Sequence, residues 1–215
     1  MFAGEYAFAH DGWPGVLTLR VSSGRNLRGS YRDHRLDQTF AVTGQVDVAV
    51  RHRVELVIHD FNWLPEQRFT GYLSTRDGML LAGTTLWEND PFGFVALRAR
   101  ELPPPVPGQA TNDVAPADFA GRYTLLHEGA EASVDLEHVD GGVLAGTCRG
   151  DGWELGVQGK IDATTAHGLT LRFTGDESVA DVRAHGHLFT RQKNAISGEI
   201  RNGDTVTGFG LLREG

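Results

Sequence analysis

The stretch FAGEYAFAHDG, residues 2–12, recurs in altered form as FAGRYTLLHEG, residues 119–129. Both stretches keep a phenylalanine, a glycine, a tyrosine and a histidine at the same spacing. An offset of 117 positions also places Gly29 on Gly146, and after a two-residue deletion beyond Tyr31 an offset of 115 holds to the end. Because a single gap suffices over the whole repeat, we infer that the chain contains two copies of one unit.

A proline-rich segment, ELPPPVPGQATNDVAPAD, separates the two copies. Proline lacks a backbone donor and favours extended conformations, so this segment is typical of a semi-rigid linker. Each copy carries its own apolar pattern, which predicts that each closes its own core. We therefore expect a first domain over residues 1–101, a linker over 102–117 and a second domain over 118–215.

Short runs of alternating apolar and polar residues follow one another in each copy. Residues 15–21, GVLTLRV, and residues 54–58, VELVI, are examples. A period of two predicts half-buried β-strands, and pairs such as Ser-Gly at 23–24 and Asp-Gly at 77–78 predict the turns between them. In the first copy we expect strands near residues 3–10, 15–22, 26–33, 38–48, 53–60, 67–75, 79–87 and 92–99.

Eight antiparallel strands joined by short turns can close into an up-and-down barrel, which leaves no exposed edge. The interior of such a barrel is just wide enough for side chains or for one small ligand. The sequence therefore predicts an all-β protein made of two eight-stranded antiparallel up-and-down barrels in tandem.

The composition excludes several classes of partner. The net charge of −8 is spread along the chain without a basic stripe, so we expect no nucleic acid. There is no signal pattern and no apolar run of about 18 residues, so we expect no membrane partner. The single cysteine, Cys148, cannot form an internal disulfide, and the expected location is cytoplasmic.

Five short motifs of the first copy follow the order found in a known family. They are GEY at residues 4–6, LRGSY at 27–31, FAVTGQVD at 40–47, FTGYL at 69–73 and TTLW at 84–87. On these motifs the chain resembles the avidin/streptavidin family of eight-stranded biotin-binding barrels, one of the calycin-like folds. The resemblance covers essentially the whole of each repeat, less clearly in the second.

This resemblance implies roles for three residues. Tyr31 matches the tyrosine that hydrogen-bonds the ureido oxygen of biotin, Phe69 matches an aromatic residue after strand 5, and Trp87 matches one wall of the pocket. It also implies association through barrel walls, between the two copies or as a homodimer. Phe8, however, stands where the family has asparagine, and a site lacking its polar partners loses on the order of 10⁴ in discrimination. Biotin is therefore not the expected ligand.

Alternation places a set of aromatic side chains inside the first barrel, and the first copy as a whole holds 13 of the 19 Phe, Tyr and Trp residues. An apolar cavity with few polar points is typical of a small-molecule site. We expect a protein that binds a hydrophobic small molecule without a cofactor. The expected ligand-binding residues are Tyr6, Phe8, His10, Tyr31, Phe69 and Trp87.

Two other functions fit the same pattern. The first is a barrel-type cyclase or isomerase acting on a polyketide- or terpenoid-like substrate, in which His10, Tyr31 and Asp60 would steer protons or polarise a carbonyl. The second is a protein-interaction or inhibitor module with two solid barrels. A cavity in the first copy favours the binder or the enzyme, and a filled interior favours the interaction module.

Two histidines near the end of the chain have the spacing of metal ligands. His185 and His187 lie two residues apart and point to one side of a strand, with His138 or His167 as a third candidate. Parity places them outside the barrel, facing solvent or the other domain, and no Cys/His cluster accompanies them. We therefore expect no metal.

Overall fold

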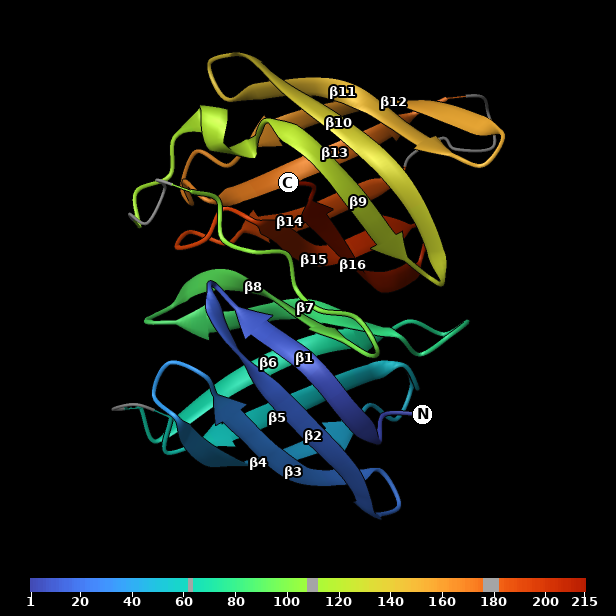
Figure 1. The fold of residues 1–215 in the computed structure, drawn as a ribbon. Coiled ribbons are helices and arrows are strands. Elements are labelled where there is room, and N and C mark those ends of the chain that lie inside the picture. Colours follow the sequence, from blue (N-terminus) through green and yellow to red (C-terminus); the bar gives the residue numbers. More distant parts are fainter. Residues whose placement is uncertain (62–63, 108–111, 176–181) are drawn as a thin grey trace.

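The computed structural model describes residues 1–61, 64–107, 112–175 and 182–215. It forms two closed eight-stranded antiparallel barrels, one after the other along the chain (Figure 1). The predicted fold class is confirmed. Within the described ranges, no helix is long and apolar enough to cross a membrane.

Each of the eight strands expected in the first copy is present, with ends close to those predicted. The first barrel consists of β1 (Gly4–His10), β2 (Trp13–Ser23), β3 (Asn26–Asp33), β4 (Gln38–Val46), β5 (Arg53–His59), β6 (Glu66–Leu73), β7 (Leu80–Trp87) and β8 (Asp90–Leu97). β1 pairs with both β2 and β8, which closes the barrel.

The second barrel follows a short 3-10 helix, η1 (Pro116–Phe119). Its strands are β9 (Gly121–His127), β10 (Ala130–Asp140), β11 (Val143–Gly150), β12 (Trp153–Ile161), β13 (Gly168–Thr174), β14 (Arg183–Leu188), β15 (Ala195–Asn202) and β16 (Thr205–Arg213). β9 pairs with β10 and β16, so the closure repeats that of the first barrel.

Close strand approach explains why the duplication keeps particular glycines. A Cβ on Gly29 would lie 1.8 Å from the carbonyl oxygen of Thr18, and one on Gly146 would lie 1.9 Å from that of Asp135. No side chain fits at either distance. The two positions are equivalent in the repeat, so both copies retain glycine for the same steric reason.

The walls of the two barrels pack against each other (Figure 1). β7 and β8 of the first barrel contact β14, β15 and β16 of the second. A separate apolar cluster lies between them, consisting of Ala9, Leu80, Ala82, Val95, Leu97, Leu126, Phe189, Ala195 and Leu212, with Leu102 of the linker beside it. Association through barrel walls, which the resemblance implies, therefore occurs within one chain.

This interface is reciprocal. The Nε2 atom of His52 lies 2.9 Å from the carbonyl oxygen of Val206, and the Nε2 atom of His167 lies 2.8 Å from that of Pro91. In the repeat alignment His52 corresponds to His167, and Pro91 corresponds to Val206. Each barrel thus offers the other the same contact, as in an isologous dimer.

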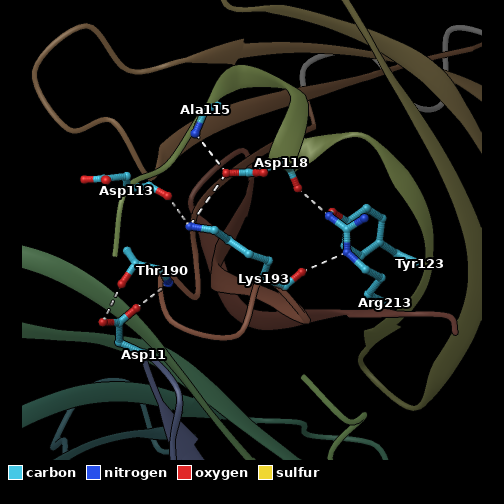
Figure 2. A network of polar contacts seen from close by, with 8 residues as sticks. All are labelled: Asp11, Asp113, Ala115, Asp118, Tyr123, Thr190, Lys193 and Arg213. Carbon is cyan, nitrogen blue, oxygen red and sulfur yellow. Dashed lines mark hydrogen bonds and ion pairs between the residues drawn. The ribbon is translucent and has the colours of Figure 1, made fainter. Parts of the chain in front are cut away.

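The linker is anchored to the second barrel by a buried lysine (Figure 2). The Nζ of Lys193 donates to the carbonyl oxygen of Asp113 at 2.5 Å and lies 3.6 Å from the Asp118 carboxylate. Arg213 donates to the carbonyl oxygens of Lys193 and Asp118, which joins the linker, η1 and the last strand. Because a buried ammonium group is costly without partners, this network fixes the path of the chain between the barrels.

Candidate functional site

One end of the first barrel opens beside the second barrel. The turns after β1 and β7 lie there, and a groove of about 350 Å³ is formed between them, the adjoining ends of β6 and β8, and the turn after β14. We call it the mouth groove. Its walls are formed by His10, Asp11, Trp13, Gln67, Thr85, Trp87, Asp90, Phe92, Asn112, His167, Thr190 and Arg191.

Aromatic rings and an arginine from the second barrel form part of this groove. The indole of Trp13 is nearly parallel to the imidazole of His10, with ring centroids 6.4 Å apart. The guanidinium groups of Arg35 and Arg191 lie 3.8 and 5.3 Å from the Trp13 ring. Phe92 stacks on His167 at 4.4 Å. Flat surfaces beside fixed charges suit a planar ligand.

His10 lines the groove and has an unsatisfied nitrogen. Its side chain is 2% exposed, and its Nε2 atom has no hydrogen-bond partner among the described protein atoms. Burial among aromatic rings lowers the pKa of His10 to about 3. The imidazole is therefore neutral at physiological pH, with one N–H and one acceptor nitrogen, so it can take part in hydrogen bonds but is not a cationic acid.

Gln67 has a second unsatisfied polar atom at the same place. The Thr85 hydroxyl donates to the carbonyl oxygen of Arg68 at 2.7 Å, so towards Gln67 it can only accept. The Gln67 amide nitrogen donates to it at 3.3 Å, which fixes the orientation of the amide. The Oε1 atom of Gln67 is then buried without a partner among the described residues.

The second barrel provides an internal comparison. There His127, the counterpart of His10, has the Thr207 hydroxyl 2.7 Å from its Nε2 atom. Phe92 stands in the first barrel where Thr207 stands in the second, and Val182 and Ile200 replace Gln67 and Thr85. In the second barrel the histidine is therefore paired and the two other polar side chains are absent, which shows that the fold does not require the unpaired atoms of the first barrel.

The predicted ligand-binding residues fall into three groups. His10 and Trp87 line the mouth groove. Phe8, Tyr31 and Phe69 lie deeper, where Phe8 contacts both other rings at centroid distances of 5.2 and 5.6 Å. These three are fully buried and fill the barrel interior below the groove.

Tyr6 lies towards the other end of the barrel. Its hydroxyl group donates to the carbonyl oxygen of Phe2 at 2.8 Å and accepts from Arg98 at 2.5 Å. Tyr123 and Arg213 repeat this arrangement in the second barrel. Because both copies have this arrangement, we assign Tyr6 a structural role in barrel closure.

The three candidate catalytic residues are placed differently. The rings of His10 and Tyr31 are neighbours, 6.1 Å apart, and the Tyr31 hydroxyl lies 3.1 Å from the Asp33 carboxylate. Burial, followed by the charge of Asp33, raises the pKa of Tyr31. Asp60 is exposed beyond the end of β5, where its φ of 54° turns the chain out of the strand. The alternation that predicted an inward Asp60 ends one residue earlier.

Sequence reasoning missed Trp13, Gln67 and Arg191. Gln67 shares its strand face with Phe69, so parity could have found it. Trp13 begins β2 directly after a turn, where alternation gives no direction. Arg191 comes from the other barrel, and no pattern within one copy predicts that contact.

His185 and His187 lie outside the second barrel, as parity predicts. His187 is buried on the side facing the first barrel, 5.1 Å from the His185 ring and 5.6 Å from the His167 ring. In the part of the chain that the structure describes, no group of three or more His, Cys, Asp or Glu residues is arranged to hold a metal ion.

These features define a class of protein: a tandem pair of closed eight-stranded barrels, joined through their walls, with a groove at the mouth of the first. Neither the models of known protein families nor the curated protein sequences contain a match to this chain.

Proposed function

We propose that the protein binds a small planar molecule in the mouth groove of its first barrel. The volume of about 350 Å³ is in the range of small-molecule sites. Trp13, Trp87 and Phe92 supply ring surfaces, and Gln67 and His10 supply polar atoms that need partners.

The observation that carries the proposal is the pair of unsatisfied atoms, His10 Nε2 and Gln67 Oε1. A buried polar atom without a partner costs about 1–3 kcal/mol, and the second barrel avoids this cost at both positions. A ligand with a donor for Gln67 regains that free energy on binding. Both residues line the groove but these two atoms are buried, so we expect side chains there to shift as the ligand enters.

The resemblance to avidin-like barrels belongs to the same proposal. Trp87, matched to a pocket wall of that family, is at the groove, whereas Tyr31 and Phe69 lie beneath it. Aromatic rings fill the interior that this family uses for its ligand, and that filling by itself favours the interaction module. We propose instead that a ligand is held nearer the mouth, in the groove. Stacking on the indoles and one or two hydrogen bonds are sufficient for micromolar affinity.

A thermal-shift screen of planar heterocycles and hydrophobic metabolites, with biotin included, tests the proposal. Hits should raise the melting temperature of the native protein. They should not stabilise the variant Gln67→Val/Thr85→Ile/Trp87→Asn, in which each residue is the one found in the second barrel. Leu86→Asn, at an exposed neighbour, is the matched control. Hits that stabilise all three proteins equally would contradict the proposal.

A further inference from the structure

Four exposed arginines gather at the end of the first barrel opposite the mouth groove. Arg20, Arg25 and Arg28 belong to the β2–β3 hairpin, and Arg51 belongs to the turn between β4 and β5. Among the described residues none of the four forms an ion pair. We call this surface the arginine end.

Apolar side chains protrude beside these arginines. Met1 and Val48 are each 70% exposed, and Val21 is 56% exposed. A shallow groove of about 430 Å³ runs between them, and Arg25 and Arg51 are part of its lining. The nearby carboxylates of Asp47 and Glu55 share one partner, Arg53, at 2.6 and 2.9 Å, which leaves one negative charge beside the four arginines. The arginine end is thus cationic with three separate apolar tips.

The fold does not require these residues. Arg20 lies directly opposite Arg28 across the β2–β3 pair, an arrangement of like charges that destabilises a sheet. At the equivalent positions the second barrel has Glu137 and Ala145, and it forms the same hairpin. Gly142 and Ala166 likewise replace the other two arginines. The cluster is specific to the first copy and has a cost, which indicates a binding role.

We propose that the arginine end docks on the surface of a membrane that contains anionic lipids. Guanidinium groups bind phosphate and carboxylate oxygens in a bidentate manner, and single apolar tips can enter the interfacial layer of a bilayer. A lipid surface accommodates exposed apolar side chains at any spacing, and its anionic headgroups match the four guanidinium groups beside them.

The net charge of −8 does not oppose this contact. At physiological ionic strength charges are screened beyond about 8 Å, so the distant second barrel has little influence. The expectation of no membrane partner is based on the lack of an apolar run long enough to span a bilayer. A peripheral contact does not need such a run. In this orientation the mouth groove, at the other end of the barrel, remains open.

Co-sedimentation with vesicles tests the proposal. The protein should bind vesicles of phosphatidylcholine with phosphatidylserine, bind vesicles of phosphatidylcholine alone much less, and be released by high salt. Each arginine at an anionic surface contributes about fivefold in affinity, so Arg25→Glu/Arg51→Glu should weaken binding by at least about tenfold. The control Lys160→Glu/Arg172→Glu makes the same change in charge on the exposed wall of the second barrel and should bind normally.

Val21→Ser/Val48→Ser should also weaken binding, at an unchanged melting temperature. No binding to the anionic vesicles at low salt would overturn the proposal, as would equal losses in the arginine variant and the lysine–arginine control. Binding to polyglutamate without binding to vesicles would indicate an acidic protein partner and would overturn it too.

Discussion

Asp11, in the turn after β1, accepts two hydrogen bonds from Thr190 in the other barrel, from the backbone N–H at 2.5 Å and from the hydroxyl group at 2.9 Å (Figure 2). Glu128 accepts the same two hydrogen bonds from Thr75. Asp11 corresponds to Glu128 in the repeat, and Thr75 corresponds to Thr190. Both copies of the repeat have an acidic residue followed by a glycine after the first strand. The contact of this acidic residue with a threonine of the other barrel explains why both copies retain it.

Replacing Thr190 by valine should reduce stability by about 1–2 kcal/mol, because the half-buried carboxylate of Asp11 loses the hydroxyl donor of a buried threonine. Thr75→Val removes the equivalent contact at an exposed position and should cost less. Urea denaturation of the two variants measures the difference. Equal losses would mean that the two contacts do not differ in burial as described.

Gly208→Ala should loosen the contact between the barrels. A Cβ there would lie 2.7 Å from the carbonyl oxygen of Ala82 and 2.8 Å from that of Tyr72, so backbone must move, at a cost of about 1–3 kcal/mol. Gly210 is on the same strand, and its Cβ would meet Val95 at an ordinary 3.5 Å. Gly210→Ala is the control and should melt close to the wild type in calorimetry.

Two buried histidines should make the protein sensitive to acid. Burial lowers the pKa of His10 and of His187 to about 3, with the charges of His185 and His167 acting further on His187. In the unfolded chain a histidine has a pKa of about 6.5. Below that pH the unfolded state therefore binds protons that the folded state does not bind. Stability should therefore fall between pH 6.5 and pH 3, by on the order of 2 kcal/mol per histidine at pH 4.5.

Chemical denaturation at a series of pH values measures this loss. His187→Leu should flatten the profile, because it removes one of the depressed histidine pKa values; burial also lowers the pKa of His127, which stays in place in this variant. His138→Leu, at an exposed histidine, should leave the profile as it is. An unchanged profile in His187→Leu would contradict the assignment.

Gln67→Val should separate stability from binding. Valine is the residue of the second barrel at this position, and it removes a buried oxygen that has no partner among the described residues. We expect stability to be unchanged or raised by up to about 1 kcal/mol, while affinity for a groove ligand falls at least about tenfold. Denaturation and calorimetric titration of one preparation measure both. A loss of both would mean that Gln67 supports the fold.

Periodicity was sufficient to predict both barrels, because alternation is set by the strand itself and short turns leave few ways to connect neighbours. It also placed His10 and Trp87 on the inner faces of their strands and His187 on the outer face of its barrel. These predictions depend only on the parity of residues within one strand.

The groove itself could not be predicted in this way. Arg191 and Thr190 reach it from the second barrel, and their position depends on how two closed walls pack. Asp60 leaves the strand pattern through a left-handed backbone conformation that the sequence does not mark with glycine. Whether aromatic rings surround a cavity or fill it depends on packing in three dimensions, as the contacts of Phe8 with Tyr31 and Phe69 illustrate.

The most direct measurement of the proposed site is a titration followed by the tryptophan indole signals in a nitrogen-15 correlation spectrum. With a hit from the heterocycle screen, the signals of Trp13 and Trp87 should shift together and saturate. Trp153, exposed on the second barrel, should not move. A ligand that shifts Trp153 while leaving Trp13 and Trp87 in place would show that binding occurs away from the mouth groove.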